Sequence, residues 1–190
     1  MNKGRLEAFS DGVIAVIITI MVLEFKAPHG VEATDLLPLL PTFLTYVLSF
    51  IIVGIYWVNH HNFFQLIKKV SGGLLWANLH LLFWLSLVPF TTAWMGENHF
   101  VLWPVVTYGL NLLGCAIAYT IMTLAALRVH GANSEIAKAI GRDRKGKISV
   151  IIYVVAIISA FVSPMISCAL FLVVALIWFV PDQRIERIMN

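Results

Sequence analysis

Apolar residues fill most of this chain in long uninterrupted runs that short polar segments separate. After a first apolar segment that ends near Phe25, uncharged runs cover residues 36–67, 70–96, 98–127 and 148–181. A helix of about 20 apolar residues crosses the ~30 Å hydrocarbon layer of a bilayer, so each of these runs is long enough to span a membrane. Proline lacks the N–H that continues a helix, and Pro164 therefore divides the last run into two short segments.

The pattern predicts an all-α membrane protein with a single domain, residues 1–190, and six transmembrane helices. The predicted spans are residues 6–25, 36–63, 73–95, 101–129, 147–162 and 165–180. An even number of spans places both termini on the same side of the membrane. The polar loop of residues 130–147 is predicted to hold a short helix at residues 134–140 and no separate domain.

Composition and charge agree with this interpretation. Of the 190 residues, 60% are hydrophobic and only 12% are charged, and the mean hydropathy is +0.89, whereas a soluble domain has about 25% charged residues. Lys26 is the only basic residue expected on one side of the membrane. The other side holds Lys3, Arg5, Lys68, Lys69, Arg128, Lys138, Arg142, Arg144, Lys145, Lys147, Arg184 and Arg187. The positive-inside rule makes this side cytoplasmic, and the net charge of +3 therefore needs no nucleic-acid partner.

The first span is unusually short. At about 1.5 Å per residue, the uncharged stretch between Asp11 and Glu24 covers roughly 18 Å of the ~30 Å that a bilayer requires. Carboxylates at membrane depth are tolerated where they face protein or water, so the first helix is expected inside a bundle or assembly. Lys3 and Arg5 before an apolar run imitate a signal peptide. Glu24 and Lys26 stand where small residues would mark a cleavage site, so we expect the helix to be retained.

A narrow aliphatic stripe runs along this first helix. At about 100° per residue, Val16, Ile20 and Leu23 lie above one another, and Thr19 lies beside them. Two interpretations stay open. The stripe packs against another helix, or aliphatic rings from several copies line a water path and gate it by dewetting.

Ser10 and Asp11 point away from the aliphatic stripe. One interpretation is that they cap a helix that begins just after them. The other is an inter-helix hydrogen-bond network with Arg5 and with Asn59 and His60 of the second span, which lie at the same membrane face. Adjacent histidines diverge by about 100° on a helix, so no metal site is expected there.

Other chemistry is poorly represented. Asn78, His80 and Asn111 are expected to form hydrogen bonds between helices, and Cys115 and Cys168 to behave as small buried apolar residues. The motifs GxxxxGK[ST] and HExxH are missing, as is a serine-centred elbow, so neither an enzyme nor a cofactor is expected. The potassium-filter sequence TVGYG is also missing.

The stretch Arg5-x-x-x-Phe9-Ser10-Asp11 resembles the RxxxFSD signature of the transmembrane protein 175 family of potassium channels. The sequence GVIAVIITIMVLEF that follows and the six-span layout extend the resemblance over essentially the whole chain. Animal members carry two six-helix repeats and act in endosomes and lysosomes. This chain has one copy of the motif, so it is similar to a prokaryotic member, for which the bacterial plasma membrane is the expected location.

The resemblance implies a homotetramer in membrane lipid, with the first helix of each subunit lining a central pore. The family's hydrophobic constrictions fall on Val16, Ile20 and Leu23, and its hydroxyl position on Thr19. A leak channel for K⁺ and other monovalent cations, with a hydrophobic gate and no carbonyl filter, is the implied function. Val16 is smaller than the family's usual Ile or Leu. The alternative is a proton-coupled small-solute transporter that uses Asp11 and a histidine on a helix.

Overall fold

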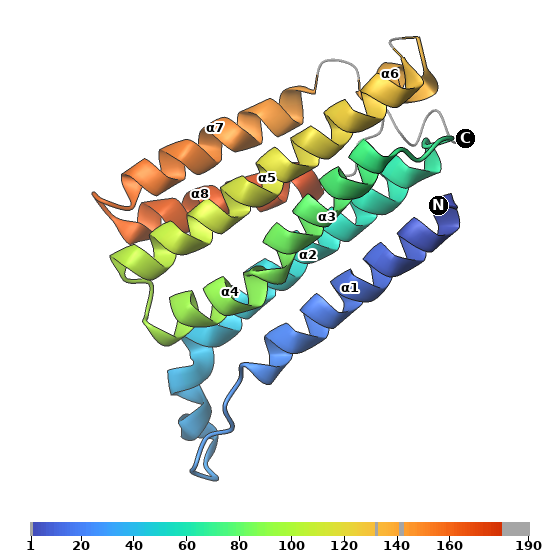
Figure 1. The fold of residues 1–190 in the computed structure, drawn as a ribbon. Helices are drawn as coiled ribbons and strands as arrows, with labels where there is room; N and C mark the ends of the chain where they lie inside the picture. The colour runs from blue at the N-terminus through green and yellow to red at the C-terminus, as the bar shows by residue number, and fades with distance from the viewer. Residues whose placement is uncertain (1, 132, 141–142, 180–190) are drawn as a thin grey trace.

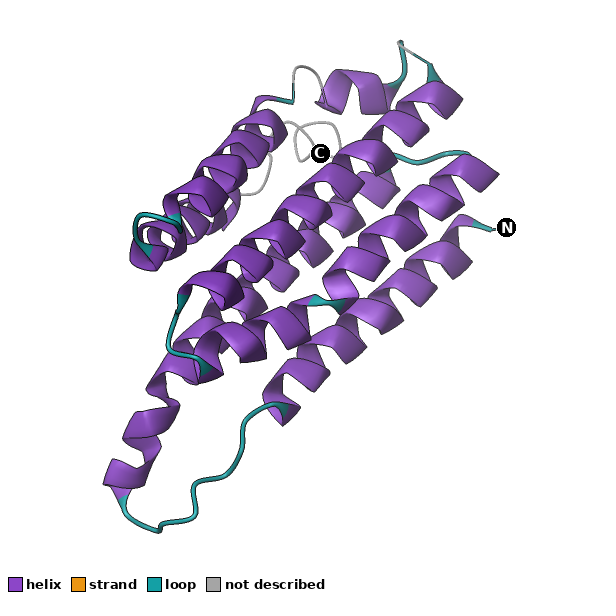
Figure 2. Ribbon diagram, turned by 60° about the vertical axis from the view of Figure 1, so that its left-hand side comes forward, coloured by secondary structure: helices purple, strands orange, loops and turns teal. Residues whose placement is uncertain are grey.

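The computed structural model describes residues 2–131, 133–140 and 143–179, and in these residues the chain is a bundle of helices without a β-strand (Figures 1 and 2). In chain order the helices are α1 (Lys3–Leu23), the 3₁₀ helix η1 (Ala33–Leu39), α2 (Leu40–Gln65), α3 (Gly72–Ser86), α4 (Val88–Glu97), α5 (Leu102–His130), α6 (Glu135–Ile140), α7 (Arg144–Ser159) and α8 (Pro164–Phe179).

The helices occupy the predicted segments, with ends that differ by a few residues. α1 begins at Lys3 instead of residue 6, because the Asn2 side chain caps it by accepting the Gly4 N–H at 3.3 Å. The short helix expected in the polar loop is α6. Arg142, Arg184, Arg187 and the last residue of the final predicted span lie outside the described residues.

The span predicted at residues 73–95 is the apolar stretch Gly72–Glu97, but its helix is interrupted at Leu87, two residues before Pro89, and continues as α4. The Asn111 amide on α5 lies at this break, with its nitrogen 3.1 Å from Thr91 Oγ1. With the amide turned over, its nitrogen donates to the Trp84 carbonyl at 2.9 Å and its oxygen accepts the Val88 N–H at 3.2 Å. In either orientation Asn111 ties α5 to the break.

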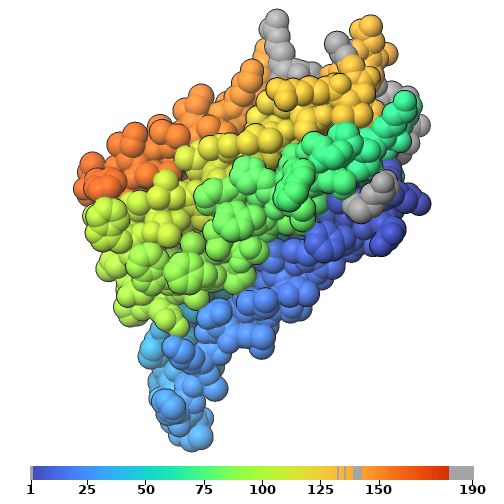
Figure 3. Space-filling view, in the orientation of Figure 1, coloured from blue at the N-terminus to red at the C-terminus, as the bar shows by residue number. Residues whose placement is uncertain are grey.

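Two hydrophobic cores hold the bundle together. The first joins α1, α2, α3 and α5 and includes Val88 of α4 and Ile136 of α6. The second joins α2, α5, α7 and α8 and includes Met95 of α4. α1 consequently lies at one edge of the bundle, and the hairpin of α7 and α8 lies at the opposite edge (Figures 1 and 2). The segment between α1 and α2 projects beyond the bundle (Figure 3).

Four helical stretches of the described chain are long and apolar enough to cross a membrane. They are Lys3–Leu23, Ala33–Gln65, Gly72–Glu97 and Leu102–His130, and α8 is a shorter apolar helix. A chain with several such stretches is a multi-pass membrane protein.

Candidate functional site

α1 has two opposite faces. The first packs into the bundle and consists of Leu6, Ser10, Ile14, Ile17 and Met21, all buried. The second contains the predicted stripe, on which Val16 is 54% exposed, Ile20 40% and Leu23 78%. The described residues of the same chain therefore do not cover the stripe, so it is not a packing surface within the subunit.

Thr19 belongs to the exposed side of α1. Its hydroxyl donates to the Val16 carbonyl at 2.9 Å, one turn back in the same helix. This bond uses the hydrogen of the hydroxyl and leaves the oxygen lone pairs available at the exposed surface. Thr19 is thus a hydrogen-bond acceptor beside three aliphatic side chains.

The buried face of α1 is fastened by a set of hydrogen-bonded side chains, Ser10, Asn78 and His60, which we call the polar triad. Asn78 on α3 donates to Ser10 Oγ at 2.9 Å, and its Oδ1 lies 2.8 Å from Nε2 of His60 on α2. A carbonyl oxygen only accepts, so Nε2 of His60 carries the hydrogen. Ser10 in turn donates to the Leu6 carbonyl at 2.9 Å. The triad is buried, with exposures of 0% for Ser10 and Asn78 and 1% for His60, and it joins three helices.

Asp11 accepts a hydrogen bond from Trp57 Nε1 on α2 at 3.0 Å. Asp11 and Ser10 both lie well inside α1, because the helix begins at Lys3 with Asn2 as its cap. The interpretation of Ser10 and Asp11 as a helix cap is therefore wrong. Both side chains instead bond to neighbouring helices.

Two residues of the predicted network, Asn59 and Arg5, and the motif residue Phe9 lie outside the triad. The Asn59 side chain donates to the Ile55 carbonyl of its own helix at 2.8 Å, and its backbone carbonyl accepts the Tyr119 hydroxyl at 3.2 Å. Arg5 and Phe9 are exposed, and among the described residues no hydrogen bond or ion pair joins Arg5 to the triad. Asn59 makes this local bond because the rotation of α2 against α1 sets the partners, and the sequence does not specify that rotation. The roles of Arg5 and Phe9 stay predictions.

Sequence reasoning missed Trp57 as a partner and saw Asn78 only as one of several intramembrane polar groups. His80, expected to bond between helices, instead accepts the Trp84 indole N–H of its own helix at 2.9 Å. Cys115 is buried, Cys168 is half-buried, and both are free thiols. A helical wheel of α2 could have found Trp57, since it lies one turn before His60 on the same face.

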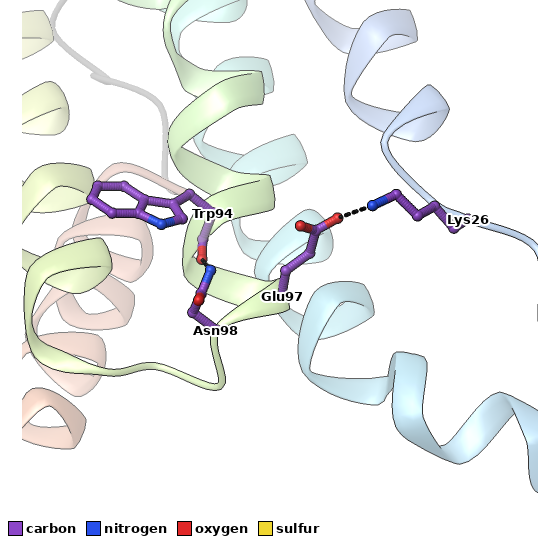
Figure 4. A network of polar contacts seen from close by, with 4 residues as sticks. All are labelled: Lys26, Trp94, Glu97 and Asn98. Carbon is purple, nitrogen blue, oxygen red and sulfur yellow. Dashed lines mark hydrogen bonds and ion pairs between the residues drawn. The ribbon is translucent and has the colours of Figure 1, made fainter.

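The segment that follows the C-terminal end of α1 is linked to α4 by an ion pair (Figure 4). Lys26 Nζ lies 3.3 Å from Glu97 Oε1, and Asn98 donates to the Trp94 carbonyl at 2.9 Å. The Lys26 side chain is 83% exposed, and such surface pairs contribute only about 0–1 kcal/mol. The pair therefore orients the segment after α1 more than it stabilises the fold.

A groove of about 860 Å³ runs between α1 and α4 on the side of the exposed stripe. Val16 and Ile20 form part of its α1 wall, and Phe90 and Trp94 form part of its α4 wall. The groove therefore extends the uncovered surface from α1 to α4.

A family model described as "Endosomal/lysosomal potassium channel TMEM175" matches residues 5–89, which include the RxxxFSD motif and the polar triad. A protein of Chryseobacterium sp. (strain P1-3) named as a potassium channel is 56% identical over 187 residues, which cover 98% of this chain and 97% of that protein. The chain belongs to the TMEM175 family. The resemblance predicted from the motif is thus confirmed.

Two further TMEM175 relatives extend the comparison. The crystal structure of a lysosomal potassium-selective channel TMEM175 homolog from Chamaesiphon minutus matches with a TM-score of 0.81 and 30% identity, over 95% of this chain and 97% of that one. A zebrafish protein named as the endosomal/lysosomal proton channel TMEM175 is 29% identical over 137 residues, 67% of this chain and 24% of that protein. The structural match includes the α7–α8 hairpin, which lies beyond the residues that the family model matches.

Proposed function

We propose that this TMEM175 family member is a subunit of a potassium-permeable channel that conducts K⁺ passively down its electrochemical gradient. Four copies would assemble with α1 of each subunit around a central pore. The observation that carries the proposal is the division of α1 into a buried face and an uncovered face with Val16, Ile20 and Leu23. The names of the Chryseobacterium and Chamaesiphon relatives agree with potassium as the permeant ion.

The proposed membrane topology has six spans, with both termini in the cytoplasm of a bacterium and the channel in its plasma membrane. Its support is the order of the helices, which run back and forth through the bundle, and the basic residues of the loops. Under this topology the polar triad lies in the cytoplasmic half of the membrane, and Leu23 lies near the outer mouth of the pore.

The proposed mechanism of conduction follows from the chemistry of the stripe. Stacked aliphatic rings offer no oxygen to a dehydrated ion, so they block flow when the constriction is dry. Permeation needs a wetted state, and oxygens of Thr19 beside the rings would replace part of the hydration shell of K⁺. The polar triad and the Trp57–Asp11 bond would hold α1 in position on the side that faces away from the pore.

A matched pair of substitutions tests this proposal, because Val16 and Val22 are both exposed on α1, at 54% and 49%, and point in different directions. Val16→Asn places an amide in the proposed constriction and is expected to raise K⁺ flux into liposomes, because it lowers the dewetting barrier. Val22→Asn adds the same amide outside the stripe and is expected to leave flux near the wild-type value. Equal effects of the two substitutions would contradict a pore along this stripe.

Proton flux is the second quantity to measure in the same liposomes, since the zebrafish relative is named as a proton channel. The alternative of a proton-coupled transporter has less support, because Asp11 and His60 are each engaged in a hydrogen bond to a neighbouring helix. A transporter shows saturable uptake that depends on a solute, whereas a channel gives cation current without one.

A further inference from the structure

A second feature lies far from α1, where α7 and α8 pack against α2 and α5. It is a small, partly open cavity with a volume of about 50 Å³, and α1 contributes none of the side chains that line it. Tyr56 of α2, Tyr153 of α7 and Trp178 of α8 are among its walls. The cavity therefore belongs to the interior of one subunit and is separate from the proposed pore.

Two phenol hydroxyls in this cavity have no hydrogen-bond partner among the described residues. Tyr153 is 3% exposed, and its ring packs against other aromatic side chains while its hydroxyl makes no such bond. The Tyr56 hydroxyl makes none either. Tyr56 is half-buried, whereas Tyr108 is fully buried, and the Tyr108 hydroxyl lies 2.9 Å from Ser49 Oγ.

The missing partners are informative because buried polar groups are almost always hydrogen-bonded. Among the described residues, every side-chain nitrogen or oxygen that is fully enclosed by protein has a partner. The Tyr56 and Tyr153 hydroxyls are thus not fully enclosed by protein, and both residues line the cavity. A guest in that space would supply the bonds that the protein does not.

The lining determines the chemistry of such a guest. Asp143 also lines the cavity, and its carboxylate is already engaged because it accepts the Gly146 N–H at 2.9 Å as a helix cap. The Lys145 ammonium lies 5.7 Å from the centre of the Trp178 ring. The inner walls are aromatic rings, aliphatic groups and hydroxyls, which favour a neutral guest over a bare ion.

The volume limits the size of the guest. A water molecule needs about 10–15 Å³ of such space, so a cavity of about 50 Å³ holds a few waters or one short-chain alcohol. Lipid headgroups are too large. We propose that the cavity is a binding site for a small neutral hydroxylic molecule, water or a short alcohol, held by the hydroxyls of Tyr56 and Tyr153.

Such a guest links two parts of the fold. Tyr56 lies on α2, and its ring contacts both hydrophobic cores, whereas Tyr153 lies on α7 and belongs to the second core. A molecule bonded to both hydroxyls joins the α7–α8 hairpin to the helices that support α1.

Two measurements on the full-length channel test the site. In a high-resolution map, we expect water density within hydrogen-bonding distance of the Tyr153 hydroxyl. With 2-fluoroethanol as the probe, we expect excess ¹⁹F transverse relaxation over protein-free micelles, and Tyr153→Phe is expected to remove most of it. Tyr46→Phe is the matched control, because it deletes a phenol hydroxyl on α2 that does not line the cavity. If Tyr153→Phe fails to fold, Tyr56→Phe serves the same purpose.

The outcomes are distinct. Water density with probe relaxation supports a site that exchanges water for alcohol, and water density without it identifies water as the guest. An empty or collapsed cavity with no excess relaxation overturns the proposal. Excess relaxation that both Tyr153→Phe and Tyr56→Phe leave intact overturns it as well, because the phenols would not hold the guest. None of these results depends on whether the channel conducts K⁺.

Discussion

The polar triad allows a quantitative prediction about what anchors α1. Asn78→Leu keeps the branched shape of the side chain but removes the bonds to Ser10 and His60. The His60 Nε2–H is then unpaired at 1% exposure, whereas the Ser10 hydroxyl keeps its bond to the Leu6 carbonyl. An unpaired buried polar group costs about 1–3 kcal/mol, and inter-helix hydrogen bonds in membranes contribute about 0.6 kcal/mol on average and up to about 1.7. We expect Asn78→Leu to lower the free energy of unfolding by about 1–3 kcal/mol.

A double-mutant cycle isolates the Ser10–Asn78 bond from the other consequences of each substitution. Ser10→Ala, Asn78→Leu and the double variant are unfolded reversibly by a denaturing detergent in mixed micelles. We expect a coupling energy of about 0.6–1.7 kcal/mol. Asn62→Leu is the control, because Asn62 lies on α2 and makes no side-chain hydrogen bond with the described residues, so its effect is expected within about 0.5 kcal/mol. A coupling energy of zero would refute the triad as an anchor of α1.

Three further predictions concern α1 and its support. Thr19→Ala removes the hydroxyl from the exposed side of α1, so the K⁺/Na⁺ permeability ratio in liposomes should change while the oligomer yield does not; an unchanged ratio contradicts the role of Thr19. Asp11→Ala removes the acceptor of an indole N–H and should reduce oligomer yield on size-exclusion chromatography, whereas Asp11→Asn keeps an acceptor and should retain most of it. Gly114→Ala places a methyl group against the Trp84 ring and should destabilise the fold by about 1–3 kcal/mol in thermal unfolding, whereas Gly54→Ala faces open space and should not.

The sequence predicts the helical segments well because membrane helices are long, apolar and separated by charged loops. The break before Pro89 was missed even though the proline is visible in the sequence. Prolines inside membrane helices are tolerated when a neighbouring polar group satisfies the freed backbone, so the residue alone does not reveal a break. Asn111 provides that group here, and its position opposite the break depends on how α5 packs.

The candidate site was predicted only where the geometry of one helix decides it. Val16, Ile20 and Leu23 share a stripe because the helical period fixes their directions, whatever lies around them. The partners of Ser10 and Asp11 depend on the rotation of α2 and α3 against α1. For this reason the sequence pointed to Asn59 as a partner, whereas Asn78 and Trp57 form the hydrogen bonds. The sequence does not contain the rotation and offset of one helix against the next, so it does not predict these partners.

The two faces of α1 together explain how a membrane helix with so short an uncharged stretch is stable. Ser10 and Asp11 find partners within the same subunit, so the polar end of α1 is satisfied before any assembly forms. The opposite face has no such partner among the described residues. A hydrophobic stripe with a hydroxyl at one edge is poorly matched to lipid when a carboxylate, here that of Asp11, lies one or two turns away. In the proposed assembly, contact with other copies and with water in the pore would remove this mismatch. The polar anchoring therefore fixes which face of α1 is left free, and that face is the one on which conduction is proposed.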